Sequence, residues 1–280
     1  LIQAFVFSAP LAPIFVALLL FHKGMQAIIA FQKRGQRMMD NVGSVEVVDE
    51  EMKAILEHQE VSGRRHLDGF SQGIDFQDVS YAYNQEDGDV LRNINIEIPA
   101  KQTVALVGES GAGKSTLVDM MTLMLRPRTG TIRIDGVPHD EVDLVSWRKQ
   151  NGYVSQETAV FDDTVANNIH LWQGNIDEDA ALRERVIHAA ERAHAHHFIE
   201  DLPNGYQTVV GDRGVRLSGG QRQRLFVARE LFKQPNLLLL DEATSDLDTA
   251  SEQHIQDSID ALKGEVTVVI IAHRLSTVKN

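Results

Sequence analysis

The stretch "TVALVGESGAGKSTLVDMM", residues 103–121, decides how the rest of the sequence is interpreted. Its first five residues predict a buried strand, and its last residues place apolar side chains at the three- and four-residue spacing of a helix. The glycines between them let backbone N–H groups close around a phosphate, and the helix dipole adds to that field. Lys114 can reach the terminal phosphates, and the Ser115 hydroxyl can hold Mg²⁺. The stretch therefore predicts a P-loop that binds a nucleotide, with these contacts: Gly108, Glu109, Ser110, Gly111, Ala112, Gly113, Lys114, Ser115 and Thr116.

The sequence on both sides of this loop predicts an α/β domain over residues 70–280. Short β-rich runs alternate with amphipathic helices, which is typical of a largely parallel sheet. The runs "VSYAY" and "LRNINIEI" alternate apolar residues at period two and predict antiparallel strands. "TVALVG", "TIRIDG", "NLLLLDE" and "VTVVIIAH" predict four more strands, three of them buried and parallel. The small and charged residues of "VSGRRHLDG", residues 61–69, predict a linker before the domain.

Residues 1–21, "LIQAFVFSAPLAPIFVALLLF", carry no charged side chain. As a helix they would extend roughly 31 Å, about the thickness of the hydrocarbon core of a bilayer. A buried core helix and a signal peptide are the alternatives, and the absence of a basic leader and of a clear cleavage site argues against the second. Lys23, Lys33, Arg34 and Arg37 follow and place the C-terminal side in the cytoplasm. We expect residues 1–60 to form a transmembrane helix that continues into the cytosol.

The run "NLLLLDEATSDLD", residues 236–248, predicts the second half of the nucleotide site. Four leucines form a buried strand, and Asp241 and Glu242 follow at its C-terminal end, where open parallel sheets bind their ligands. Asp241 suits a Mg²⁺ ligand, and Glu242 suits a base that orients or deprotonates the attacking water. A solvated acidic strand end is the alternative interpretation of this segment alone.

The stretch "LSGGQRQRLFVAREL", residues 217–231, predicts a second helix whose N-terminus binds an anion. Ser218 is a good N-cap, and Gln234-Pro235 ends the helix, which buries Leu225, Ala228 and Leu231 or Phe232. Phosphates cradled by the P-loop are covered on one side, so a second helix end can cap them only from the opposite side. The economical arrangement takes this cap from another copy of the chain, although a cap from the same chain stays open. The expected contacts are Ser218, Gly219, Gly220 and Gln221.

These motifs together resemble the ABC transporters, whose nucleotide-binding domains form head-to-tail dimers and carry "LSGGQ" as their signature. The resemblance covers roughly residues 70–280 and implies ATP and Mg²⁺ as cofactors. It implies that Tyr83 stacks on adenine, with Tyr81 as the alternative, and that His273 contacts the γ-phosphate. Gln156 matches the glutamine that senses Mg²⁺ and faces the membrane domain. The implied catalytic residues are Glu242, His273 and Lys114, and the implied metal ligands are Ser115, Gln156 and Asp241.

The membrane helix and the stretch "TVVGDRG", residues 208–214, make the chain similar to exporter-type half-transporters. Such a chain carries six membrane helices followed by an ATPase domain with a parallel core sheet, an antiparallel β subdomain and a helical subdomain. By this resemblance the present sequence contains the last membrane helix and a C-terminally truncated domain. Two departures stand out. Asp246 takes the place of a small residue in "SDLD", and Val209 takes the place of the usual glutamate.

The resemblance implies ATP-driven export or flipping of a substrate across the bacterial inner membrane, with the ATPase domain in the cytoplasm. The expected partners are a second half-transporter, in a homodimer, and membrane lipids. Lipid-linked saccharides, other lipids and drugs are all possible substrates. A soluble ABC-type ATPase acting on nucleic acid or ribosomes is the alternative, but the net charge of −13 argues against a nucleic-acid partner. A nucleotide-dependent gate with little turnover is the third possibility.

Four histidines in "VIHAAERAHAHHFIE" form a possible metal-binding cluster: His188, His194, His196 and His197. His194 and His197 could share one helix face. A solvated helix face is the preferred interpretation. The chain contains no cysteine, which excludes disulfides and thiolate metal ligands.

Overall fold

The computed structural model describes residues 11–57, 60–84, 88–155, 159–212, 214–241 and 249–272. The chain divides into two compact units between Val61 and Ser62.

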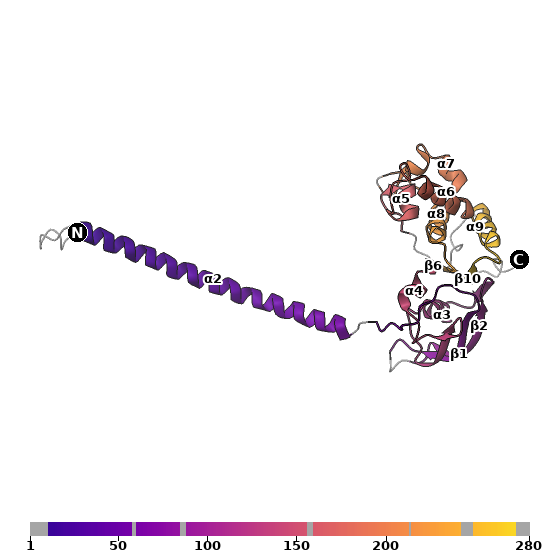
Figure 1. The fold of residues 1–280 in the computed structure, drawn as a ribbon, viewed down its shortest axis with the longest axis horizontal. Helices are drawn as coiled ribbons and strands as arrows, with labels where there is room; N and C mark the ends of the chain where they lie inside the picture. Colours follow the sequence, from indigo (N-terminus) through magenta and orange to yellow (C-terminus); the bar gives the residue numbers. More distant parts are fainter. Residues whose placement is uncertain are drawn as a thin grey trace. The chain divides into compact units, whose positions relative to one another are not determined.

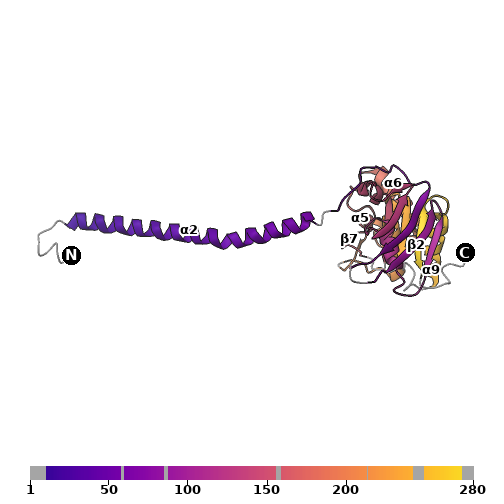
Figure 2. The ribbon, with the colours of Figure 1, turned by 90° about the horizontal axis from the view of Figure 1, so that it is seen from below.

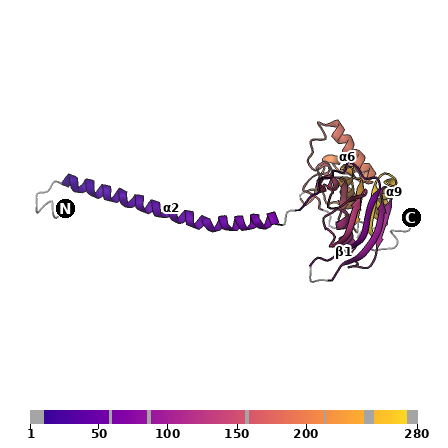
Figure 3. The same cartoon turned by 60° about the horizontal axis from the view of Figure 1, so that its bottom comes forward.

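The first unit is a single long helix, α2 (Leu11–Glu57), which runs without a break in Figures 2 and 3. Pro13 lies in its first turn, where a missing N–H costs no internal hydrogen bond. The part Leu11–Met39 contains an 18-residue stretch with a mean hydropathy of 1.9, which is long and apolar enough to cross a membrane, and none of that stretch is buried among the described residues. The predicted continuation of an apolar helix into a polar one is confirmed.

The second unit contains an antiparallel sheet with the strand order β2-β1-β4-β5. Its strands are β1 (Gly73–Tyr81), β2 (Leu91–Pro99), β4 (Thr129–Ile134) and β5 (Val137–Pro138). Strand β1 pairs with β2 on one side and with β4 on the other, both antiparallel. The predicted antiparallel start of the domain is confirmed.

A second sheet is fully parallel and has the order β3-β10-β9-β6. Its strands are β3 (Thr103–Val107), β10 (Thr267–Ala272), β9 (Leu237–Asp241) and β6 (Asn151–Val154). Strand β6 was not predicted, because the four residues "NGYV" are too short and too polar to indicate a strand. It forms because its backbone continues the sheet beside β9, from Asn151 opposite Leu237 to Val154 opposite Leu240.

The central strands β9 and β10 are buried on both faces, which explains their nearly continuous apolar sequences. Leu238 and Leu240 pack into one core with the helices, and Leu237 and Leu239 pack into another core with the antiparallel sheet. Figure 1 shows α5, α6, α7 and α8 grouped at one end of this unit and α3, β1 and β2 at the other. The helices of this unit are α3 (Lys114–Met121), α4 (Leu144–Arg148), α5 (Val165–His170), α6 (Ala180–Arg192), α7 (His196–Glu200), α8 (Gly219–Phe232) and α9 (Thr249–Ala261).

The stretch predicted to be a linker, residues 61–69, is largely bonded to the domain. The Gly63 N–H donates to the Val142 carbonyl at 2.9 Å, and the Arg65 N–H donates to the Glu141 carbonyl at 2.8 Å. The Leu67 side chain is buried. These long-range bonds place the start of the second unit at Ser62, before the end of the predicted linker.

His194 and His197, which could have shared one helix face, do not lie on the same helix. Helix α6 ends at Arg192 and α7 begins at His196, and His194 between them has a left-handed backbone with φ of 49°. His197 is exposed and lies 3.3 Å from the Asp201 carboxylate. In the described part of the chain, no group of three His, Cys, Asp or Glu side chains is placed to hold a metal ion.

Candidate functional site

The start of the P-loop and Asp241 lie at the same edge of the parallel sheet. Ile271 of β10 lies opposite Leu106 of β3 on one side and opposite Asp241 of β9 on the other. The P-loop therefore begins two strands away from Asp241, at the carboxyl edge where such sheets bind ligands. Gln156, Glu242 and His273 lie outside the described residues. They follow β6, β9 and β10 within two residues in the sequence.

The loop itself, residues 108–113, turns through two glycines in the left-handed region. Gly111 has a φ of 81° and Gly113 has a φ of 84°. At Gly113 a Cβ atom would lie 2.8 Å from Leu91 Cδ2, so a side chain would be both strained and crowded there. Gly113 is the N-cap of α3, and the loop backbone therefore leads directly into the positive end of that helix.

A pocket of about 290 Å³ lies in front of this loop. Its residues offer an ammonium group, hydroxyls and a helix N-terminus, which is a donor set that suits a phosphate chain. The exposed Ser115 hydroxyl, at the start of α3, is the kind of oxygen ligand that Mg²⁺ accepts. The residues present thus fit a nucleotide with its Mg²⁺. The pocket is lined by Tyr83, Val90, Ser110, Gly111, Gly113, Lys114, Ser115, Thr116 and Ile271.

The Lys114 ammonium lies over the loop. Its Nζ donates to the Gly108 carbonyl at 2.9 Å and to the Glu109 carbonyl at 2.8 Å. An ammonium group has three protons to donate, so this arrangement leaves one for a ligand oxygen. The side chain therefore stabilises the turn of the loop and presents a positive charge at the pocket.

Tyr83 lies at the rim of the same pocket. Its hydroxyl is 3.0 Å from Thr116 Oγ1. The Tyr81 ring contacts the Tyr83 ring edge-on, with 5.1 Å between the two ring centroids. Tyr83 is 58% exposed, so a planar ligand can stack on its ring. Of the two predicted candidates, Tyr83 lines the pocket, and Tyr81 is not among the lining residues.

Asp241 ends β9 at the sheet edge, where it meets a tyrosine that the sequence did not indicate. The Tyr153 hydroxyl of β6 donates to Asp241 Oδ2 at 3.2 Å. Burial raises the pKa of the Tyr153 phenol, and the negative charges of Asp241 and Asp119 raise it further. Burial also raises the pKa of Asp119, and the Asp241 charge adds to that shift. The carboxylates of Asp241 and Asp119 therefore make this region negatively charged, as a cation site requires.

The N-terminus of α8 has the predicted cap. Ser218 Oγ accepts from the Gln221 N–H at 3.2 Å, and Gln221 Oε1 accepts from the Ser218 N–H at 2.9 Å. A serine hydroxyl that accepts one bond can still donate its own proton, here to a phosphate oxygen. Ser218 and Gly219 are exposed, so a ligand can approach this helix end from outside the chain.

The other end of α8 is fixed by two buried charged residues. The Arg229 side chain, 5% exposed, donates to the Asn168 carbonyl at 2.7 Å, to Asn168 Oδ1 at 3.0 Å and to the Ala159 carbonyl at 3.1 Å. Glu230 Oε2 accepts from the Tyr153 N–H at 3.2 Å. Helix α8 is therefore bonded to the chain on both sides of residues 156–158. Sequence reasoning missed both residues, because charges in a helix usually indicate an exposed face.

The stretch before α8 is bonded to the same region. Strand β8 (Val209–Val210) pairs with β7 (Asp163–Thr164), which lies a few residues after Gln156 in the sequence. Val209, one of the two departures noted in the sequence, is 44% exposed. The segments that flank Gln156 and the helix with the "LSGGQ" stretch therefore form one connected part of the domain.

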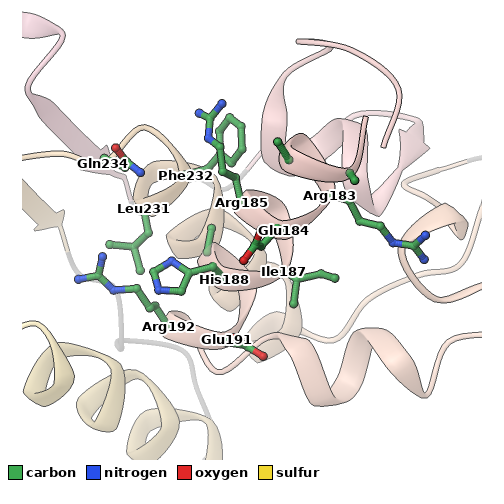
Figure 4. A pocket seen from close by; sticks show the side chains of 13 residues that line it. Arg183, Glu184, Arg185, Ile187, His188, Glu191, Arg192, Leu231, Phe232 and Gln234 are labelled. Carbon is green, nitrogen blue, oxygen red and sulfur yellow. The ribbon is translucent and has the colours of Figure 1, made fainter. Parts of the chain in front are cut away.

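A larger pocket, of about 830 Å³, lies elsewhere, between α6 and the end of α8 (Figure 4). The Arg185 guanidinium lies over the Phe232 ring at 4.5 Å from its centroid. The lining mixes the charges of Arg183, Glu184 and Glu191 with an apolar floor. None of the predicted nucleotide contacts within the described residues lines it. The smaller pocket at the P-loop therefore remains the candidate site.

The chain is similar to known proteins over most of its length. Residues 91–245 match the family described as ABC transporter. The chain is 48% identical over 218 residues to an ATP-dependent lipid A-core flippase of Coxiella burnetii, covering 78% of this chain and 36% of that protein. It is 44% identical over 221 residues to ABC transporter B family member 1 of Dictyostelium discoideum, covering 79% of this chain and 24% of that protein.

A solved structure of a bacterial Atm1-family ABC exporter with ATP bound has a similar fold. The TM-score is 0.73 at 38% identity, over 83% of this chain and 40% of that one. The chain thus spans well under half the length of the relatives and of the exporter that it matches.

Proposed function

The chain belongs to the ABC transporter family, and from this premise we propose that it is part of an exporter-type half-transporter. In this proposal residues 1–60 are the last transmembrane helix with its cytosolic extension, and the domain that follows is the nucleotide-binding domain. ATP hydrolysis by this domain drives the export or flipping of a substrate across the membrane. The observation that carries the proposal is the presence, on one domain, of a P-loop pocket and of a separate, exposed helix N-terminus with the signature sequence.

The proposed nucleotide contacts divide into three groups. The loop residues 108–116 hold the phosphates, and the Lys114 ammonium neutralises their charge. The Tyr83 ring stacks on the adenine. Ser115, Asp241 and Gln156 would hold the Mg²⁺, which would supply charge neutralisation to the phosphates when bound.

Hydrolysis in this proposal depends on two residues that follow the strands. Glu242, directly after Asp241, orients and deprotonates the attacking water. His273, directly after β10, contacts the γ-phosphate. The strands that precede them, β9 and β10, are neighbouring, parallel and buried along nearly all of their length. Such strands hold their ends in a fixed geometry, which suits a catalytic pair.

The second phosphate contact comes from another copy of the domain. Ser218, Gly219, Gly220 and Gln221 of one copy cap the ATP bound to the P-loop of the other, so that two nucleotides lie between two domains. This head-to-tail pairing satisfies twofold symmetry, because each copy gives one surface and receives the other. A homodimer is the simplest form, since the chain carries both halves of the site.

Movement of the domain is then transmitted towards the membrane. ATP stabilises the closed pair only by its higher affinity for the closed state than for the open one. The bonds of Arg229 and Glu230 make α8 move together with the segments that flank Gln156. These segments, with the stretch 208–214, form the surface that would face the membrane region.

The membrane and the substrate are proposed from the helix and from the relatives. Helix α2 is apolar enough to span a bilayer, and its exposed apolar side chains require lipid or other membrane helices as partners. Several relatives are named lipid A-core flippases. We therefore place the protein in the bacterial inner membrane, with a lipid-linked saccharide as the preferred substrate. A soluble ATPase acting on nucleic acid is not favoured by these relatives.

The test is Mg-ATP hydrolysis by the complete half-transporter in lipid vesicles. Lipid-linked saccharides, phospholipids, peptides and hydrophobic drugs are added one class at a time, and the Glu242→Gln variant measures the background. We expect lipid-linked saccharides to raise hydrolysis above the rate in phospholipid vesicles, because the substrate shifts the population towards the closed state. Hydrolysis that is indifferent to every class and to the membrane would contradict the transport function.

A further inference from the structure

The hydroxyl group of Tyr153 forms a hydrogen bond with the side chain that we assign to the Mg²⁺ site. It donates to Asp241 Oδ2 at 3.2 Å, across the junction of β6 and β9. A hydrogen bond to a carboxylate is stronger than one between neutral groups and fixes the orientation of the acceptor. This bond limits rotation of the Asp241 carboxylate and so fixes the direction in which its other oxygen, Oδ1, points.

The phenol is itself held in place on both sides. Tyr153 pairs with Leu239 in the parallel ladder, and its side chain packs against the core that contains Leu237 and Leu239. Its backbone N–H donates to Glu230 Oε2 of α8 at 3.2 Å. At the preceding Gly152 a Cβ atom would lie 3.0 Å from Leu238 Cδ1, so β6 packs tightly here. The tyrosine therefore has little freedom to turn away from Asp241.

The electrostatics of the site call for such a donor. Burial raises the pKa of Asp119 on α3, and the negative charge of Asp241 raises it further. The Tyr153 hydroxyl donates a hydrogen bond to one of these two carboxylates, Asp241, and so disperses part of its negative charge.

We propose that Tyr153 is a positioning residue for the metal: its hydroxyl orients the Asp241 carboxylate so that Mg²⁺ binds with the nucleotide. This inference rests on the proposed function, because it takes Asp241 as a Mg²⁺ ligand. Residues that hydrogen-bond to metal ligands commonly change metal affinity by about 10- to 100-fold when they are replaced. The nucleotide contacts of the P-loop do not pass through Tyr153, so ATP affinity without metal is independent of it.

The experiment measures how much Mg²⁺ tightens ATP binding, with the complete half-transporter carrying Glu242→Gln to prevent turnover. The dissociation constant of ATP is determined once in EDTA and once with saturating Mg²⁺, and their ratio gives the contribution of the metal. We expect Tyr153→Phe to lower this ratio about tenfold and to leave the dissociation constant in EDTA unchanged. The unchanged value in EDTA also shows that the variant is folded.

Two further variants separate the possible explanations. Tyr206→Phe removes another half-buried phenol, which bonds to His196 Nδ1 at 2.8 Å in the helical region, and it should leave the ratio unchanged. Asp241→Asn should bring the ratio close to one. If Tyr153→Phe keeps or raises the ratio while Asp241→Asn brings it close to one, the inference about Tyr153 is wrong and the assignment of Asp241 to the Mg²⁺ site stands. If Asp241→Asn also keeps the ratio, the assignment of Asp241 in the proposed function fails.

Discussion

Replacing Glu242 with glutamine is expected to lower ATP turnover at least about a hundredfold while ATP binding is retained. The amide has the shape of the carboxylate but cannot take a proton from the attacking water. The change also removes one negative charge beside the phosphates, so it does not oppose nucleotide binding. Hydrolysis is measured as phosphate release, and binding is measured with a fluorescent ATP analogue on the same preparation.

The matched control is Glu265→Gln, which makes the same chemical change on the surface of the same domain. The Glu265 side chain is 68% exposed and pairs only with Arg192 among the contacts that the structure describes. Exposed ion pairs of this kind contribute little to stability, so this variant should hydrolyse ATP at the parent rate. Near-normal turnover in Glu242→Gln would remove Glu242 from the role of base.

Replacing Lys114 with alanine is expected to weaken ATP binding itself. Hydrogen bonds to charged groups contribute about 1.5–3 kcal/mol, which corresponds to roughly 10- to 100-fold in the dissociation constant. The variant also loses the bonds from Nζ to the Gly108 and Glu109 carbonyls, so the loop is less well ordered for the ligand. Titration with the fluorescent analogue measures the effect.

Lys149→Ala removes an exposed lysine at the end of α4 and is the control for the loss of positive charge. Its ATP affinity should equal that of the parent. The two active-site variants are impaired at different steps, since Lys114→Ala weakens ATP binding and Glu242→Gln lowers only ATP turnover. If Lys114→Ala binds ATP as tightly as the parent, the P-loop assignment is contradicted.

The features that the sequence predicted correctly are those set by local pattern. The four leucines at 237–240 are buried on alternating faces of the parallel sheet, as a continuous apolar strand requires. Ser218 caps α8 as its position before "GGQ" predicts. Gly111 and Gly113 of the P-loop have positive φ angles, which glycine adopts freely. In each case neighbouring residues alone determine the conformation.

The features that the sequence did not predict depend on contacts between distant segments. Strand β6 exists because β9 lies beside it, and the bond from Tyr153 to Asp241 joins residues that are 88 positions apart. Arg229 is buried because the Asn168 and Ala159 oxygens provide its hydrogen bonds. His194 lies in the turn between α6 and α7, and its left-handed backbone conformation separates the two helices. No local pattern carries this information.

The central claim is that ATP lies between the P-loop of one chain and the α8 N-terminus of another. The most direct measurement is ATP trapping in a mixed dimer, in which one chain carries Lys114→Ala and the other carries Ser218→Arg, both with Glu242→Gln. If the cap comes from the other chain, one site carries both lesions and the second site carries none. The account predicts one trapped ATP per mixed dimer, and little trapping in either homodimer. If the mixed dimer traps none, each chain caps its own nucleotide and the account is contradicted.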